Sequence, residues 1–269
     1  MAERIKFSKY WDQVAREWPQ KSHSSQLLAE HKRKTHLDLV ARWAEVTNNQ
    51  RILKTDLFEE AFGADQFLFD LAKVSNNVMG MDISWEITSQ AKRKVKHYGL
   101  DASKYICCDV KQLPLRSDSI DLIISNSTLD HFPDKTDIIA ALQELRRVLC
   151  IGSTLIITLD NKGKLGEPFR RLWILLGLAP CFQGKTYSIE ELKPVLQDLG
   201  FSVEDTTAII HQPMFFLKMT VRVLHKLSAK KFDPLIKKIL VLLDTLEKRR
   251  TKYLTGLYIA VKAVKVEMP

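Results

Sequence analysis

The chain of 269 residues lacks any long uncharged apolar segment. Its longest such run, Leu172 to Phe182, is much shorter than the ~20 residues that cross a bilayer as a helix. The first residues, MAERIKFSKYW, also lack the apolar core of a secretory signal peptide. These absences argue against membrane spanning and secretion and predict a cytoplasmic protein.

Cysteine and glycine are both scarce, with four and ten residues. No cysteine belongs to a Cys-x-x-Cys pair or has a histidine at the spacing of a metal site. The sequence therefore excludes a disulfide scaffold and a zinc finger, and we expect no metal site. Because no Gly/Ser-rich linker or internal repeat divides the chain, it favours one domain with additions over two independent domains.

The excess of basic over acidic residues lies mostly in the last quarter of the chain. Residues 209–269 carry 13 basic and 4 acidic side chains, whereas residues 51–208 carry 19 and 22. A slightly acidic middle repels phosphodiesters, so the charge pattern disfavours nucleic acid as a partner.

From Arg51 onward, short runs of β-forming residues alternate with longer stretches of helical period, as in βαβ units around a parallel sheet. Seven strands are predicted, at residues 51–55, 77–81, 104–108, 120–125, 154–159, 201–206 and 257–264. Helices are predicted between them, at about residues 65–74, 85–98, 135–149 and 188–199. Gly99 and Gly200 follow two of these helices, where a left-handed residue is favoured.

Three additions to this core are predicted: an N-terminal helical cap, residues 1–50, and insertions at about 161–187 and 209–252 within a main domain of residues 51–269. In the cap, helices are predicted over 7–18 and 24–46.

The second insertion carries a basic stripe, formed by Lys218, Arg222, Lys226 and Lys230 at every fourth residue opposite an apolar side. This spacing predicts an amphipathic helix, and Asp233-Pro234 predicts the start of another. The stripe is either a solvated face or a contact with an anionic membrane surface or an acidic, membrane-derived substrate.

The carboxyl ends of the first strands are the expected ligand site, because open parallel sheets bind ligands there. Asp82 ends the second strand, where a carboxylate can accept both ribose hydroxyls of an adenine nucleoside; otherwise it caps the next helix. Asp109 ends the third strand, where it either accepts the adenine amino group, with the Val110 amide against the ring, or forms a turn.

The stretch 51–160 resembles the class I S-adenosylmethionine-dependent methyltransferases, in their small-molecule, type 11-like branch. The resemblance is carried by MDIS from Met81, by CDVKQLPLRSDSIDLIISNSTLDHFPD from Cys108, and by LQELRRVLCIGSTLIIT from Leu142. It implies an α/β, Rossmann-like three-layer sandwich. The seven-stranded, mostly parallel sheet would have the order 3-2-1-4-5-7-6 with an antiparallel last strand.

The resemblance also implies S-adenosylmethionine as cofactor. It assigns Asp82, followed by Ile83, to the ribose and Asp109, followed by Val110, to the adenine. Asn126, at the end of the fourth strand, would face methionine or the substrate.

One departure from the family concerns the loop after the first strand. The family usually has a glycine-rich turn there, because the backbone approaches the methionyl part closely. This chain reads DLFEEAFG, with Gly63 as its only glycine. Either a longer loop reshapes the pocket, with Asp56 or Glu60 reaching the cofactor's ammonium and Gly63 giving the close approach, or cofactor binding is weakened or lost. The intact nucleoside positions favour the first alternative.

His131 lies just beyond the fourth strand and is the candidate general base. Alternatively, His131 only begins the next helical segment. A general base is then not needed, because methyl displacement chiefly requires alignment and desolvation. Lesser candidates by position are Tyr10, Trp11, Tyr187 and His211.

The sequence thus predicts an S-adenosylmethionine-dependent methyltransferase (EC 2.1.1 type) that acts on a small, apolar or lipid-like molecule. The alternative is a non-catalytic adenosyl-binding protein, or a basic RNA- or lipid-binding protein on the same fold. A dinucleotide oxidoreductase is disfavoured because no G-x-G-x-x-G follows the first strand. Base methylation of nucleic acids is disfavoured because Asn126 begins NSTL instead of Asn/Asp-Pro-Pro-aromatic. The oligomeric state stays open.

Overall fold

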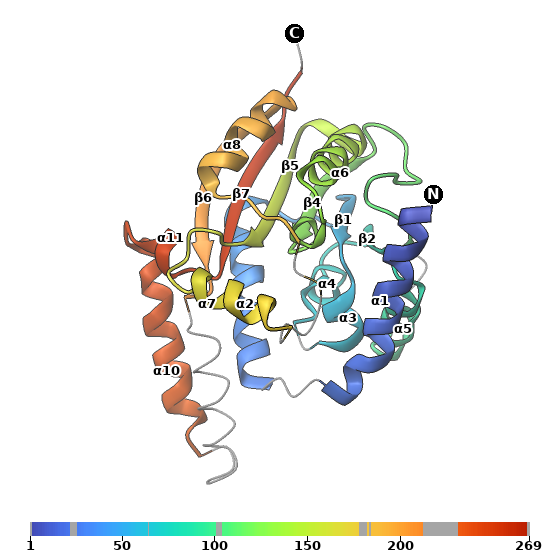
Figure 1. Cartoon of the computed structure of the whole chain (residues 1–269). Helices are drawn as coiled ribbons and strands as arrows, with labels where there is room; N and C mark the ends of the chain where they lie inside the picture. The colour runs from blue at the N-terminus through green and yellow to red at the C-terminus, as the bar shows by residue number, and fades with distance from the viewer. Residues whose placement is uncertain are drawn as a thin grey trace.

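The structure is a computed structural model that describes residues 2–21, 26–63, 65–100, 104–177, 182, 184–211 and 231–267. Seven strands form one sheet of order β3-β2-β1-β4-β5-β7-β6 (Figure 1). Strand β7 runs antiparallel to β5 and β6, whereas the other pairs are parallel. The strands are β1 Ile52–Thr55, β2 Val78–Asp82, β3 Tyr105–Cys107, β4 Ile120–Asn126, β5 Leu149–Asp160, β6 Phe201–Ile209 and β7 Tyr258–Lys265. The predicted sheet order and strand directions are confirmed.

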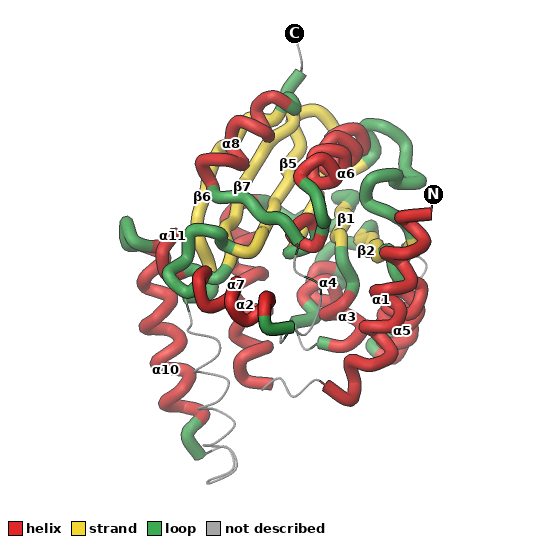
Figure 2. The backbone as a smooth tube through the Cα atoms, in the orientation of Figure 1, coloured by secondary structure: helices red, strands yellow, loops and turns green. Residues whose placement is uncertain are grey.

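Helices cover both faces of the sheet and give a three-layer sandwich (Figure 2). They are α1 Ala2–Lys21, α2 Gln26–Trp43, α3 Phe58–Phe62, α4 Phe67–Leu71, α5 Trp85–His97, α6 Lys135–Val148, α7 Glu167–Leu175, α8 Ile189–Asp198, α10 Asp233–Asp244 and α11 Lys252–Thr255. Two short 3-10 turns are η1 Leu129–His131 and η2 Thr245–Lys248. One core joins α6 and α8 to the sheet, and the other joins α1, α2, α4 and α5 to it.

The central strands are apolar on both faces because helices cover both sides of the sheet. Ile52 and Leu53 of β1 and Leu122 and Ile123 of β4 are all fully buried. Adjacent apolar residues that face both sides of the sheet are typical of parallel strands inside a sandwich, which explains why the sequence identifies these strands.

Local signals fix the helix ends. Ser84 is the N-cap of α5, because its hydroxyl accepts the N–H of Ile87 at 3.2 Å. Ser188 and Glu191 form a capping box at the start of α8. Gly99 and Gly200 have φ of 70° and 73°, as expected for left-handed residues after helices.

The structure differs from the predicted elements around the first loop. The helix predicted over 65–74 is shorter, and the unpredicted helix α3 precedes it. Buried Glu60 and Ala61 anchor α3, so its stability comes from tertiary burial more than from a sequence pattern. Strand β5 also begins at Leu149, five residues before the predicted start at Thr154, because the chain passes from α6 directly into it.

Helices α1 and α2, at the N-terminus, pack against the sandwich. The hydroxyl of Ser8 in α1 donates to the carbonyl of Ile83 at 3.0 Å, beside the end of β2. In α2, Leu27 and Leu28 pack with Ile236 and Leu240 of α10.

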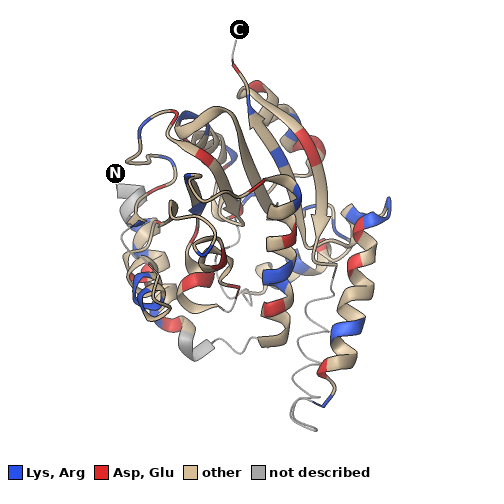
Figure 3. Ribbon diagram, turned by 180° about the vertical axis from the view of Figure 1, so that it is seen from behind, with Lys and Arg blue, Asp and Glu red and all other residues tan. Residues whose placement is uncertain are grey.

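The helix predicted to start at Asp233-Pro234 is present as α10. The basic stripe lies within 212–230, outside the described residues. Lysine and arginine residues are also seen on α10 and on the turn after it (Figure 3). Among the described residues, no helix is long and apolar enough to cross a membrane.

Candidate functional site

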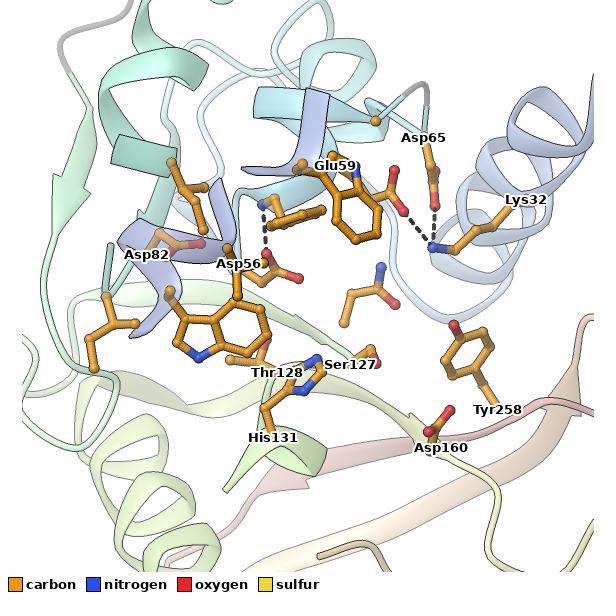
Figure 4. Close-up of a pocket in the computed structure, with 18 of the residues that line it drawn as sticks. Lys32, Asp56, Glu59, Asp65, Asp82, Ser127, Thr128, His131, Asp160 and Tyr258 are labelled. Atoms are coloured by element: carbon orange, nitrogen blue, oxygen red, sulfur yellow. Dashed lines mark hydrogen bonds and ion pairs between the residues drawn. The ribbon is translucent and has the colours of Figure 1, made fainter. Parts of the chain in front are cut away.

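A cavity of about 450 Å³ lies at the carboxyl ends of the central strands. Two residues beside it, Asp56 after β1 and Ser127 after β4, have left-handed backbones with φ of 71° and 50°. Such conformations are costly for non-glycine residues and cluster at functional sites. The lining includes Asp56, Asp82, Ser127, Thr128 and His131 from the strand ends, with Lys32, Glu59, Asp65, Asp160 and Tyr258 around them (Figure 4).

Asp82 ends β2 and is 6% exposed. One carboxylate oxygen accepts the N–H of Leu57 at 3.0 Å, and the other accepts the N–H of Ser84 at 2.8 Å. Burial and the nearby charge of Asp56 raise the pKa of Asp82 to about 7, although both N–H groups oppose the shift. Because Ser84 is the N-cap of α5, the capping alternative for Asp82 is wrong.

The other residues predicted to bind the nucleoside differ in whether they reach the cavity. Ile83 and Val110 line the cavity. Asp109 is not among the lining residues; its carboxylate accepts the N–H of Lys111 at 2.9 Å. This hydrogen bond is the one expected if Asp109 forms a turn.

The glycine-poor loop after β1 borders the cavity through Asp56, Phe58, Glu59 and Gly63. The carboxylate of Asp56 accepts the N–H of Phe58 at 2.6 Å. Burial raises the pKa of Asp56, which the charge of Lys54 opposes. The loop thus brings two carboxylates, Asp56 and Glu59, to the cavity wall.

Glu60 does not line the cavity. Its carboxylate pairs with Lys54 Nζ at 2.8 Å, and both side chains are almost completely buried. Lys54 also donates to the carbonyl of Asp56. Burial lowers the pKa of Lys54, but the charges of Glu60 and Asp56 and the hydrogen bond to Glu60 together outweigh burial and raise it. The carboxylate of Glu60 is therefore paired with Lys54 inside the protein and does not face the cavity, where the sequence predicted a contact with the cofactor.

The end of β4 is a hydrogen-bonded cluster. Asn126 lines the cavity, and its side-chain oxygen accepts the hydroxyl of Thr158. Thr128 and Thr55 join their hydroxyls at 2.7 Å. These bonds fix the wall between the strand ends and η1.

His131 is the last residue of η1 and lines the cavity. Its Nδ1 lies 3.0 Å from the carbonyl oxygen of Phe182. Since a carbonyl oxygen only accepts, Nδ1 donates and leaves Nε2 as the basic nitrogen of the neutral ring. The ring meets Trp11 edge to face at 4.8 Å, which holds its plane.

Aromatic rings form the apolar part of the cavity lining. They come from α1, as Phe7, Trp11 and Trp18, and from Phe58 and Phe132. Helix α1 lies beside the end of β2, where the hydroxyl of Ser8 donates to the carbonyl of Ile83.

The three other lesser candidates do not line the cavity. The hydroxyl of Tyr10 accepts the N–H of Phe182, Tyr187 is buried beneath Lys135, and His211 bonds to Thr255.

Sequence reasoning missed Lys32, Asp160 and Tyr258. They come from α2, the end of β5 and the start of β7, and all three line the cavity. The strand-end rule applied to β5 would have identified Asp160. No spacing along the chain links Lys32 or Tyr258 to the site, because tertiary packing alone brings them there.

Residues 59–157 match a family model described as "Methyltransferase domain". This stretch includes Asp82, Asp109 and His131 and coincides with β2 to β5 of the observed sheet. The chain carries a class I S-adenosylmethionine-dependent methyltransferase domain. No curated protein sequence matches it significantly.

Solved structures share the fold of this methyltransferase. One is an S-adenosylmethionine-dependent methyltransferase from Thermotoga maritima, described as a possible histamine N-methyltransferase, with a TM-score of 0.60, 14% identity and coverage of 96% of this chain and 99% of that chain. Another is phosphoethanolamine N-methyltransferase 2 of Haemonchus contortus in complex with S-adenosyl-L-methionine, with a TM-score of 0.56, 20% identity and coverage of 86% and 52%. The cyclase SpnF has a TM-score of 0.55, 19% identity and coverage of 86% and 80%. At these identities the likeness shows the fold alone.

Proposed function

We propose that this methyltransferase binds S-adenosylmethionine and transfers its methyl group to a small, apolar or lipid-like molecule by direct displacement. The observation that carries the proposal is one cavity whose lining combines polar strand ends with aromatic rings. The domain would span residues 51–269, with residues 1–50 as a cap over the site.

The polar strand ends suit the adenosyl part of the cofactor. Each carboxylate oxygen of Asp82 accepts one backbone N–H and keeps capacity for a ribose hydroxyl. Ile83 and Val110 offer apolar contacts for a flat ring. Carboxylates such as Asp56 and Glu59 favour the positive charges of S-adenosylmethionine.

The aromatic rings of the lining suit the acceptor. When bound, the cofactor supplies an electrophilic methyl group, and the protein's task is to align the acceptor and exclude water. Phe7, Trp11 and Trp18 would cover an apolar acceptor. His131 Nε2 would take a proton from an oxygen or nitrogen acceptor.

Two measurements on the full chain test the proposal. Isothermal titration with S-adenosylmethionine and S-adenosylhomocysteine should show one site per chain. Methyl-labelled S-adenosylmethionine, incubated with a panel of amphiphilic amines, phenols and fatty acids, should then label at least one compound. Binding without transfer would favour the adenosyl-binding alternative, and absence of binding would overturn the proposal.

A further inference from the structure

The charges around the cavity are unevenly distributed. Five carboxylates line it, from Asp56, Glu59, Asp65, Asp82 and Asp160. Among the described lining residues, Lys32 is the only lysine or arginine. A ligand carboxylate is therefore repelled by most of the wall and attracted to a single point.

Lys32 is held at that point by its neighbours. Its Nζ lies 2.9 Å from a carboxylate oxygen of Glu59 and 3.5 Å from one of Asp65 (Figure 4). Asp65 is anchored in turn by Nδ1 of His36 at 2.8 Å. Burial lowers the pKa of Lys32, but the charge of Glu59, with smaller contributions from Tyr258 and Asp65, raises it well above its ordinary value. Lys32 is thus positively charged at neutral pH.

We infer that Lys32 binds the carboxylate, and Glu59 the ammonium, of the amino-acid end of S-adenosylmethionine. The inference rests on the proposed function. The two side chains would bind the part of the cofactor that the missing glycine-rich turn usually contacts. The Lys32–Glu59 pair presents one positive and one negative group, as an α-amino acid does. When the ligand takes both partners, Lys32 still has Asp65 beside it.

Gly63 fits the same arrangement. Its φ of −86° is open to any residue, so the glycine is not required by backbone conformation. A Cβ at Gly63 would lie only 1.6 Å from a carboxylate oxygen of Glu59 and 2.9 Å from its Cα. The glycine therefore makes room for the Glu59 carboxylate at the cavity wall.

The test compares two ligands that differ at the amino-acid end. S-Adenosylhomocysteine has this end, whereas 5′-methylthioadenosine keeps only the nucleoside. In titrations of the full chain, Lys32→Met should lower the affinity for S-adenosylhomocysteine at least tenfold. The affinity for 5′-methylthioadenosine should change less than twofold. Glu59→Gln should act in the same direction. The matched control is Lys34→Met, an exposed lysine on the same helix, which should change neither affinity.

Each outcome has a clear meaning. Lys32→Met that binds S-adenosylhomocysteine like the wild type overturns the inference and leaves the proposed function standing. An equal loss of affinity for both ligands would assign Lys32 a structural role and would also overturn the inference. A wild-type protein that binds neither ligand overturns the inference and the proposed function together. If thermal melting shows that Lys32→Met is unfolded, Glu59→Gln decides, and its unchanged S-adenosylhomocysteine affinity contradicts the inference.

Discussion

Replacement of Asp82 by alanine should remove most cofactor affinity at pH 8 with little loss of stability. Each hydrogen bond from a ribose hydroxyl to an ionised carboxylate contributes about 1.5–3 kcal/mol. Loss of two such bonds removes at least about 3 kcal/mol, which is more than 100-fold in affinity. Titration with S-adenosylhomocysteine measures this change.

The stability of this variant reflects two opposing effects. Alanine leaves the N–H groups of Leu57 and Ser84 without their acceptor, at a cost of about 1–3 kcal/mol each. It also removes a buried negative charge beside Asp56. Burial and the charge of Asp56 make that ionised carboxylate unfavourable at pH 8, as its raised pKa shows. Because the two effects offset, the melting temperature should change little.

The pH dependence separates the ribose assignment from a structural role. The folded protein holds the Asp82 proton more tightly than the unfolded chain. Its contribution to stability is therefore present below about pH 4 and is lost as pH rises through about 7. Cofactor affinity should change in the opposite direction and increase from pH 6 to pH 8, as the carboxylate ionises. In Asp82→Ala both slopes should flatten. A loss of affinity below fivefold at pH 8 would refute the ribose assignment.

Three further substitutions test other parts of the site. His131→Gln should lower kcat at least 100-fold for an acceptor that must lose a proton, with S-adenosylhomocysteine affinity within twofold; unchanged kcat would leave His131 as a wall residue only. Lys54→Met should destabilise the protein by about 3–5 kcal/mol in urea unfolding, because Glu60 is left as an unpaired buried charge, and Glu60→Leu added to it should restore much of that loss. Gly63→Val should weaken the binding of S-adenosylhomocysteine, because the valine side chain displaces the Glu59 carboxylate, while the melting temperature falls only slightly. Normal binding together with a much lower melting temperature would make Gly63 a turn residue.

The sequence predicts the sheet well because its central strands carry a strong local signal. Ile52 and Leu53 in β1 and Leu122 and Ile123 in β4 are adjacent apolar residues, as expected of a parallel strand covered on both faces. Helix α3 is missed because its five residues lack a clear apolar period and are fixed by burial of Glu60.

The site is predictable where chemistry follows strand ends. Asp82 ends β2 and Val110 follows β3 closely, so the topology alone brings them to one edge of the sheet. Lys32 and Tyr258 stand far from them in the chain and reach the cavity through packing of α2 and β7. Glu60 is the opposite case. Its position shortly after β1 predicts a contact with the ligand, but its carboxylate forms an ion pair with Lys54 of β1.

A crystal structure of the full chain with S-adenosylhomocysteine would show where the cofactor binds. We expect the ribose hydroxyls within hydrogen-bonding distance of Asp82, the adenine against Ile83 and Val110, and the sulfur facing Asn126 and His131 across the cavity. A ligand bound elsewhere, or a ribose away from Asp82 in an otherwise unchanged fold, would contradict this expectation.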